Sequence, residues 1–164
     1  IGGLVALLQQ VEVGHSVDGG HCYDSWTARR IRELVAERGV RYHRVAAGDS
    51  LVGLGGVGGL VLHPNEEYVD ASGVSAAGLN NGSVAFRLEH GEVNVLFTGD
   101  LEEETDGAIL AWGPRLAAQL LKVAHHGKAQ AGNNVMHRGT YLLEVNHIGL
   151  GKNTAASSYP RRMS

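Results

Sequence analysis

Residues 83–100 read SVAFRLEHGEVNVLFTGD and are the most regular stretch of the chain. Apolar side chains alternate along 84–88 and again along 93–97, and His90-Gly91 lies between the two runs. Alternation with a period of two, interrupted by a glycine-containing turn, is typical of a β-hairpin. The second strand of this hairpin would deliver Thr98-Gly99-Asp100 to its C-terminal end.

A second polar group follows another apolar run. Residues 120–124, LLKVA, predict a strand that ends in His125-His126-Gly127. Strand ends are where sheet-based sites collect their ligands, and a carboxylate with a neutral imidazole suits zinc or manganese. The alternative is a helix-capping Asp100 beside two surface histidines, and the spacing alone does not decide between them.

The rest of the chain predicts a mixture of strands and helices in one compact domain, 1–164, with a blurred pattern over residues 129–164. The clearest helix is Asp24–Arg38, capped by Asp24 or Ser25 and stopped by Gly39. Further expected elements are a short helix at Leu4–Gln10, a brief strand at Val11–Val13, strands at Val40–Ala46 and Gly59–Leu62, and a turn at Gly48-Asp49. The acidic run Glu102–Glu104 is interpreted as negative charge that favours a helix N-terminus.

Composition excludes several classes of protein. The 164 residues are 43% hydrophobic and only 19% charged, which argues against disorder. A net charge of −3 provides no overall basic field for nucleic acid or anionic lipid, so such contacts would need a local patch. The single cysteine, Cys22, excludes an internal disulfide framework and a thiolate metal cluster.

Two glycine-rich matches carry no function. Gly53–Gly58 fits G-x-G-x-x-G by letter, but a short strand and Pro64 follow where a dinucleotide fingerprint needs a helix, so we interpret it as a β-turn. Gly149–Thr154 resembles half of a P-loop, but Asn153 stands where the pattern requires Ser or Thr directly after the lysine. Among the other histidines, His63 is interpreted as structural, His90 as exposed, and His15 and His21 as solvated loop residues.

The chain resembles the metallo-β-lactamase superfamily, and within it the hydrolase domain of the ComEC competence proteins and their free-standing relatives. Four stretches carry the resemblance, in the order and at the intervals of the family: Leu62-His63-Pro64, Asn80–Val84, Val95–Glu102 and Leu120–Gly127.

The resemblance implies an α/β (α+β) fold, the αββα sandwich, with a binuclear zinc or manganese site at one edge. It implies that Asp100 bridges the metals, that His125 is the late metal histidine, and that His126 contacts substrate or assists proton transfer. Asn81 is a candidate for positioning substrate or a loop. Metal-activated water would attack DNA or another phosphodiester. In a bacterial ComEC-type protein the domain would face the outside of the membrane, and otherwise it would be cytoplasmic.

The chain also departs from the family pattern. It contains no H-x-H-x-D-H motif, and its opening Ile1-Gly2-Gly3-Leu4 matches the residues that follow that motif, so we expect an N-terminally truncated sandwich. Lys128 replaces the usual serine, and residues 129–164 diverge. Such a chain would bind metal weakly and be inactive alone. The alternatives are a non-catalytic remnant or interaction domain with the same fold, and a free-standing hydrolase of a small ester or lactone. The residues upstream of Ile1 would discriminate between the enzyme and the remnant.

Overall fold

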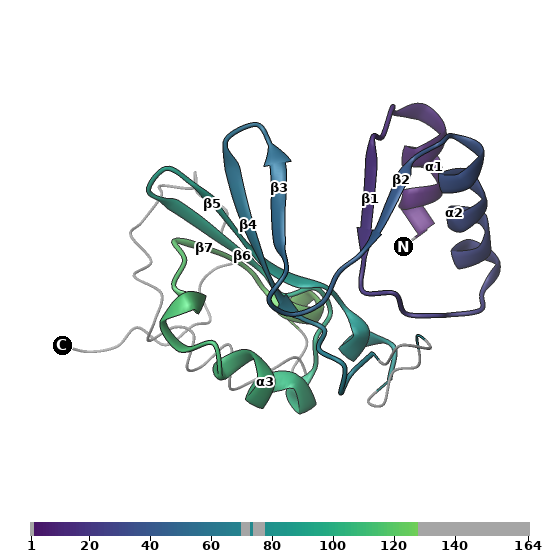
Figure 1. The fold of residues 1–164 in the computed structure, drawn as a ribbon. Helices are drawn as coiled ribbons and strands as arrows, with labels where there is room; N and C mark the ends of the chain where they lie inside the picture. Colours follow the sequence, from purple (N-terminus) through teal and green to yellow (C-terminus); the bar gives the residue numbers. More distant parts are fainter. Residues whose placement is uncertain (1, 70–72, 74–77, 128–164) are drawn as a thin grey trace, which may run out of the picture.

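The structure is a computed structural model that describes residues 2–69, 73 and 78–127 (Figure 1). It contains helices, a two-stranded sheet and a mixed five-stranded sheet. The predicted α+β class is therefore confirmed, and the arrangement is consistent with an α/β sandwich. The divergent stretch 129–164 lies outside the described residues. Within the described ranges, no helix is both long enough and apolar enough to cross a membrane.

The N-terminal part consists of α1 (Gly2–Gln10), β1 (His15–Asp18), α2 (Trp26–Glu37) and β2 (Arg41–Arg44). Ser25 is the N-cap of α2, because its hydroxyl accepts a hydrogen bond from the Ala28 N–H at 3.1 Å. The two helices pack through a small core of buried apolar residues, namely Leu8, Leu34, Val35 and Val40. The predicted helices at 4–10 and 24–38 are both confirmed.

The strand expected at Val11–Val13 is wrong. The chain is irregular there, and the strand begins at His15, four residues after Val11, where it pairs in parallel with β2. The residues of β1, His-Ser-Val-Asp, carry no apolar alternation. Backbone pairing with a strand that lies beyond α2 decides the position of β1, and this pairing leaves no local signal in the sequence.

The larger sheet has the order β3 (Ser50–Leu54), β4 (Val57–His63), β5 (Ala85–His90), β6 (Val93–Phe97) and β7 (Leu120–Lys122). The pairs β3–β4, β4–β5 and β5–β6 are antiparallel, whereas the pair β6–β7 is parallel. The predicted hairpin of residues 83–97 is β5–β6, with Phe86 opposite Phe97. The glycine-rich stretch is a β-turn, as predicted, with positive φ at Gly55 and Gly56.

One face of this sheet is covered by the segment between β6 and β7. This segment forms the short helices η2 (Glu103–Thr105), α3 (Asp106–Leu110) and η3 (Gly113–Leu116), and α3 lies against the sheet in Figure 1. Ile109 is 1% exposed and packs with Leu62, Ala85 and Leu96. The indole N–H of Trp112 donates to the Leu62 carbonyl at 2.9 Å. The segment is thereby fixed against the sheet: it starts where β6 ends and returns to the opposite edge, where β7 begins parallel to β6.

Candidate functional site: the Asp100–His125 corner

Asp100 is held by a tight turn at the end of β6. Gly99 has φ of +58°, and a Cβ at this position would lie 2.6 Å from the Cβ of Ser83, so the turn requires glycine. The Asp100 N–H donates to Ser83 Oγ at 3.1 Å. Lys122 Nζ lies 3.6 Å from Asp100 Oδ1 and donates to the Gly99 carbonyl at 2.7 Å. The carboxylate of Asp100 is 42% exposed and therefore stands at the surface beside a cation.

His125 is brought to the same corner by the parallel pairing of β7 with β6. Phe97 lies opposite Lys122, so the two chains leave the sheet side by side. The His125 N–H donates to the Gly99 carbonyl at 3.2 Å, which ties the two polar strand ends together. His125 lies in the short helix η4 (Ala124–Gly127) and has φ of +42°. A non-glycine residue in this region is strained, a feature that clusters at functional sites.

Glu102 connects this corner to η1 (Asn80–Gly82), the turn that precedes β5. Its Oε1 accepts a hydrogen bond from Asn80 Nδ2 at 2.8 Å and lies 3.2 Å from His125 Nδ1. Its backbone N–H donates to Asn81 Oδ1 at 2.8 Å. From the sequence, Glu102 is predicted to be a charge near a helix start, within one of the stretches that carry the family resemblance. Its position two residues after Asp100 was the available signal, but nothing local indicates its contact with His125.

Asn81 is completely buried and works as a structural link. Its Oδ1 accepts from Glu102, its Nδ2 donates to Glu104 Oε2 at 3.1 Å, and its carbonyl lies 2.7 Å from His63 Nε2. Because a carbonyl can only accept, His63 Nε2 must carry the proton. Of the two roles considered for Asn81, these contacts support the positioning of a loop.

His63 lies at the end of β4 and is itself completely buried, beside the ring of Tyr68 at 4.8 Å. Burial lowers its pKa, and the hydrogen bond to Asn81 opposes this shift only in part. These contacts support the structural interpretation of His63.

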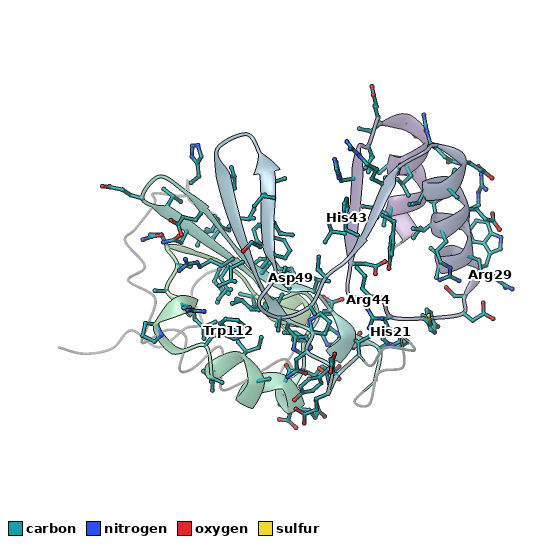
Figure 2. All side chains as sticks on the ribbon, in the orientation of Figure 1. His21, Arg29, His43, Arg44, Asp49 and Trp112 are labelled. Atoms are coloured by element: carbon teal, nitrogen blue, oxygen red, sulfur yellow. The ribbon has the colours of Figure 1, made fainter. Side chains whose placement is uncertain are left out.

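The remaining candidates lie elsewhere or cannot be placed. His126 is in η4, but its side chain is outside what the structure describes. His15 and His43 contact each other on β1 and β2, with Nδ1 and Nε2 at 2.8 Å, and Figure 2 shows His43 on that separate sheet. His90 and Cys22 are exposed, as expected for His90. The structure therefore brings together Asp100, His125 and, through Glu102, Asn81.

The described residues do not form a complete metal site. None of them cluster into a group of three or more His, Cys, Asp or Glu side chains that could hold an ion, whereas protein zinc sites use three or four ligands. The corner instead offers one carboxylate paired with an ammonium group and one imidazole beside a carboxylate. Among the described residues, this set has fewer ligands than the three or four of a protein zinc site.

Comparison with known proteins adds one relative. No protein-family model matches the sequence. Over 98 residues, the chain is 30% identical to ComE operon protein 3 of Bacillus subtilis (strain 168). The match covers 60% of this chain but only 12% of that protein, so the chain spans a small part of the relative's length. The chain is thus similar to a segment of ComE operon protein 3.

Proposed function

We propose that this chain is part of the hydrolase domain of a DNA-uptake protein, and that Asp100 and His125 belong to its active site. The observation that carries the proposal is the hydrogen bond from the His125 N–H to the Gly99 carbonyl at 3.2 Å. It joins the two polar strand ends that the sequence singled out independently. The similarity to ComE operon protein 3 supports the assignment to DNA uptake.

The charge around Asp100 and His125 indicates what this corner would need in order to bind a phosphodiester. Asp100, Glu102, Glu103 and Glu104 place four carboxylates within five residues, and the ammonium group that lies beside Asp100 in the described part of the chain is that of Lys122. An anionic substrate would be repelled by this excess of negative charge. A hydrolase built on this corner therefore needs added positive charge, and we propose zinc or manganese, with further ligands from outside the described residues.

The chain's own residues would then have distinct tasks. Asp100 supplies the carboxylate, held in place by its N–H bond to Ser83. His125 supplies the imidazole, fixed through its backbone to Gly99. Asn81 holds the loop between them through the Glu102 N–H. This division makes Asp100 and His125 the residues whose loss should remove activity, with Asn81 acting on stability.

A non-catalytic scaffold is the second candidate, and one observation favours it. Lys122 Nζ lies 3.6 Å from Asp100 Oδ1, so a cation of the protein already neutralises the carboxylate that a metal would need. A domain that has lost catalysis could keep such a pair as an ordinary surface contact. The two candidates make opposite predictions for Asp100 variants.

Phosphodiester hydrolysis by the complete gene product that contains this chain would test the proposal. Bis(p-nitrophenyl) phosphate and single-stranded DNA serve as substrates, with zinc or manganese added. We expect activity that falls to background in Asp100→Ala and His125→Ala but not in the control Glu92→Ala, an exposed turn residue. Activity that is unchanged in both variants would overturn the proposal, and its absence in a folded wild-type protein would favour the scaffold.

A further inference from the structure

We propose that Glu102 is a positioning residue that fixes the tautomer of His125. The inference rests on the proposed function, in which His125 acts through its imidazole.

The contacts of Glu102 come from three directions. Asn80 Nδ2 donates to Oε1 at 2.8 Å, which fixes this oxygen in place. Asn81 Oδ1 holds the backbone N–H at 2.8 Å. The Glu102 carbonyl accepts from Thr105 Oγ1 at 2.7 Å and from the Thr105 N–H at 3.0 Å. Backbone and side chain are therefore both anchored, and the carboxylate is preorganised before it meets His125.

The same oxygen, Oε1, lies 3.2 Å from His125 Nδ1. Only 17% of the His125 side chain and 30% of the Glu102 side chain are exposed, and Nδ1 itself is shielded from solvent. The contact is a close electrostatic one rather than an aligned hydrogen bond. At 3.2 Å, the carboxylate oxygen is the charged atom that this ring nitrogen faces.

The tautomer follows from the signs of the charges. A deprotonated Nδ1 would point a lone pair toward a carboxylate oxygen, whereas an Nδ1–H would present a positive hydrogen to it. Glu102 thus favours the proton on Nδ1 and leaves the lone pair on Nε2. A carboxylate partner on one ring nitrogen is the usual means of fixing the role of the other nitrogen.

The neighbouring acidic residue provides a matched comparison. Glu103 is exposed and shares the same acidic run at the start of η2, so it contributes similar charge to the helix start. If Glu102 acted only as helix-start charge, removal of either residue would have the same effect. The contact with Nδ1 predicts that only Glu102 controls the imidazole.

Long-range ¹H–¹⁵N NMR of the histidine rings measures the tautomer directly in the 164-residue chain. In the wild-type protein we expect the His125 Nδ1 resonance at the protonated position and Nε2 at the unprotonated position. In Glu102→Ala the Nδ1–H tautomer of His125 should lose population to the Nε2–H tautomer. Glu102→Gln, whose amide oxygen still presents partial negative charge to Nδ1, should restore the pattern in part, and Glu103→Ala should leave it unchanged.

Two results would overturn the inference. One is an Nε2–H tautomer of His125 in the wild-type protein, which needs no variant and therefore no assumption about folding. The other is an unchanged Nδ1–H tautomer in a folded Glu102→Ala protein. Neither result depends on hydrolysis. If the activity test fails and the Nδ1–H tautomer depends on Glu102, only the proposed function is overturned. If the activity test succeeds and the tautomer does not depend on Glu102, only the role of Glu102 is overturned.

Discussion

The loss of the Asn81 side chain should destabilise the protein measurably. In Asn81→Ala the Glu102 N–H loses its partner, Oδ1, which now lies at 2.8 Å from it. Asn81 is completely buried, so water does not readily replace the lost oxygen. A buried donor left without a partner costs about 1–3 kcal/mol. The second lost bond, to the exposed Glu104, adds little because solvent can compensate there.

We therefore expect Asn81→Ala to lower the free energy of unfolding by about 2 kcal/mol. For a chain of this length that corresponds to a fall in the melting midpoint of about 4–8 °C. Trp112 reports on the unit that contains Asn81, because its indole is bonded to Leu62 in the sheet. The chain has two tryptophans, and Trp26 is 69% exposed, so a Trp26→Phe background leaves Trp112 as the single fluorescent probe.

Urea titration of Trp112 fluorescence gives the free energy, with Asn65→Ala as the matched control. Asn65 also accepts a backbone N–H through its side chain, at 3.2 Å from Glu67 N, but this bond is exposed. Its loss should cost under about 1 kcal/mol. An Asn81→Ala protein no less stable than Asn65→Ala would refute the argument that Asn81 links the loops of the corner.

Three further predictions concern the core, the buried histidine and the Lys122–Asp100 pair. Ile109→Ala should lower the free energy of unfolding by about 2–5 kcal/mol in urea titration, because Ile109 is 1% exposed where it packs on the sheet. The control Val52→Ala removes an exposed side chain and should change the free energy of unfolding by under about 0.5 kcal/mol. Burial lowers the pKa of His63, so the folded protein binds a proton at His63 less readily than the unfolded chain does. The free energy of unfolding should therefore be at its full value above the ordinary histidine pKa of about 6.5, and it should fall as the pH drops below that value. His63→Gln should remove this part of the pH dependence of the urea midpoint and His90→Gln should not, so an equal slope in the two variants would contradict the reasoning. Lys122→Met should raise the affinity for Mn²⁺ in calorimetry, because it removes the ammonium group beside the Asp100 carboxylate. The control Arg87→Met, which removes the partner of Glu89, should leave the affinity unchanged. A lower affinity in Lys122→Met would show that the ion pair does not compete with Mn²⁺.

The sequence predicts much of the sheet because its signals are local. Alternation along residues 84–97 determines β5 and β6, and the cap at Ser25 determines the start of α2. The convergence of Asp100 and His125 depends on the parallel pairing of β6 with β7, which lie more than twenty residues apart and share no local pattern. Sequence spacing therefore left open whether the two ends meet.

The errors and omissions have the same cause. Strand β1 is polar and is positioned by its pairing with β2, so apolar alternation placed it too early in the chain. The role of Glu102 arises from contacts with Asn80 and with His125, each about twenty residues away in sequence. The acidic run does begin a helical segment, as predicted, but that local signal gives no information about which of its carboxylates reaches the imidazole.

Under the proposed function, the Asp100–His125 corner would supply part of a metal site and not the whole of it. Calorimetric titration of the 164-residue chain with Zn²⁺, compared with Asp100→Ala, tests this claim most directly. We expect weak binding that does not saturate at a defined stoichiometry and that becomes weaker still in Asp100→Ala. Tight, stoichiometric binding that is lost in Asp100→Ala would contradict it, because the chain would then hold a complete site.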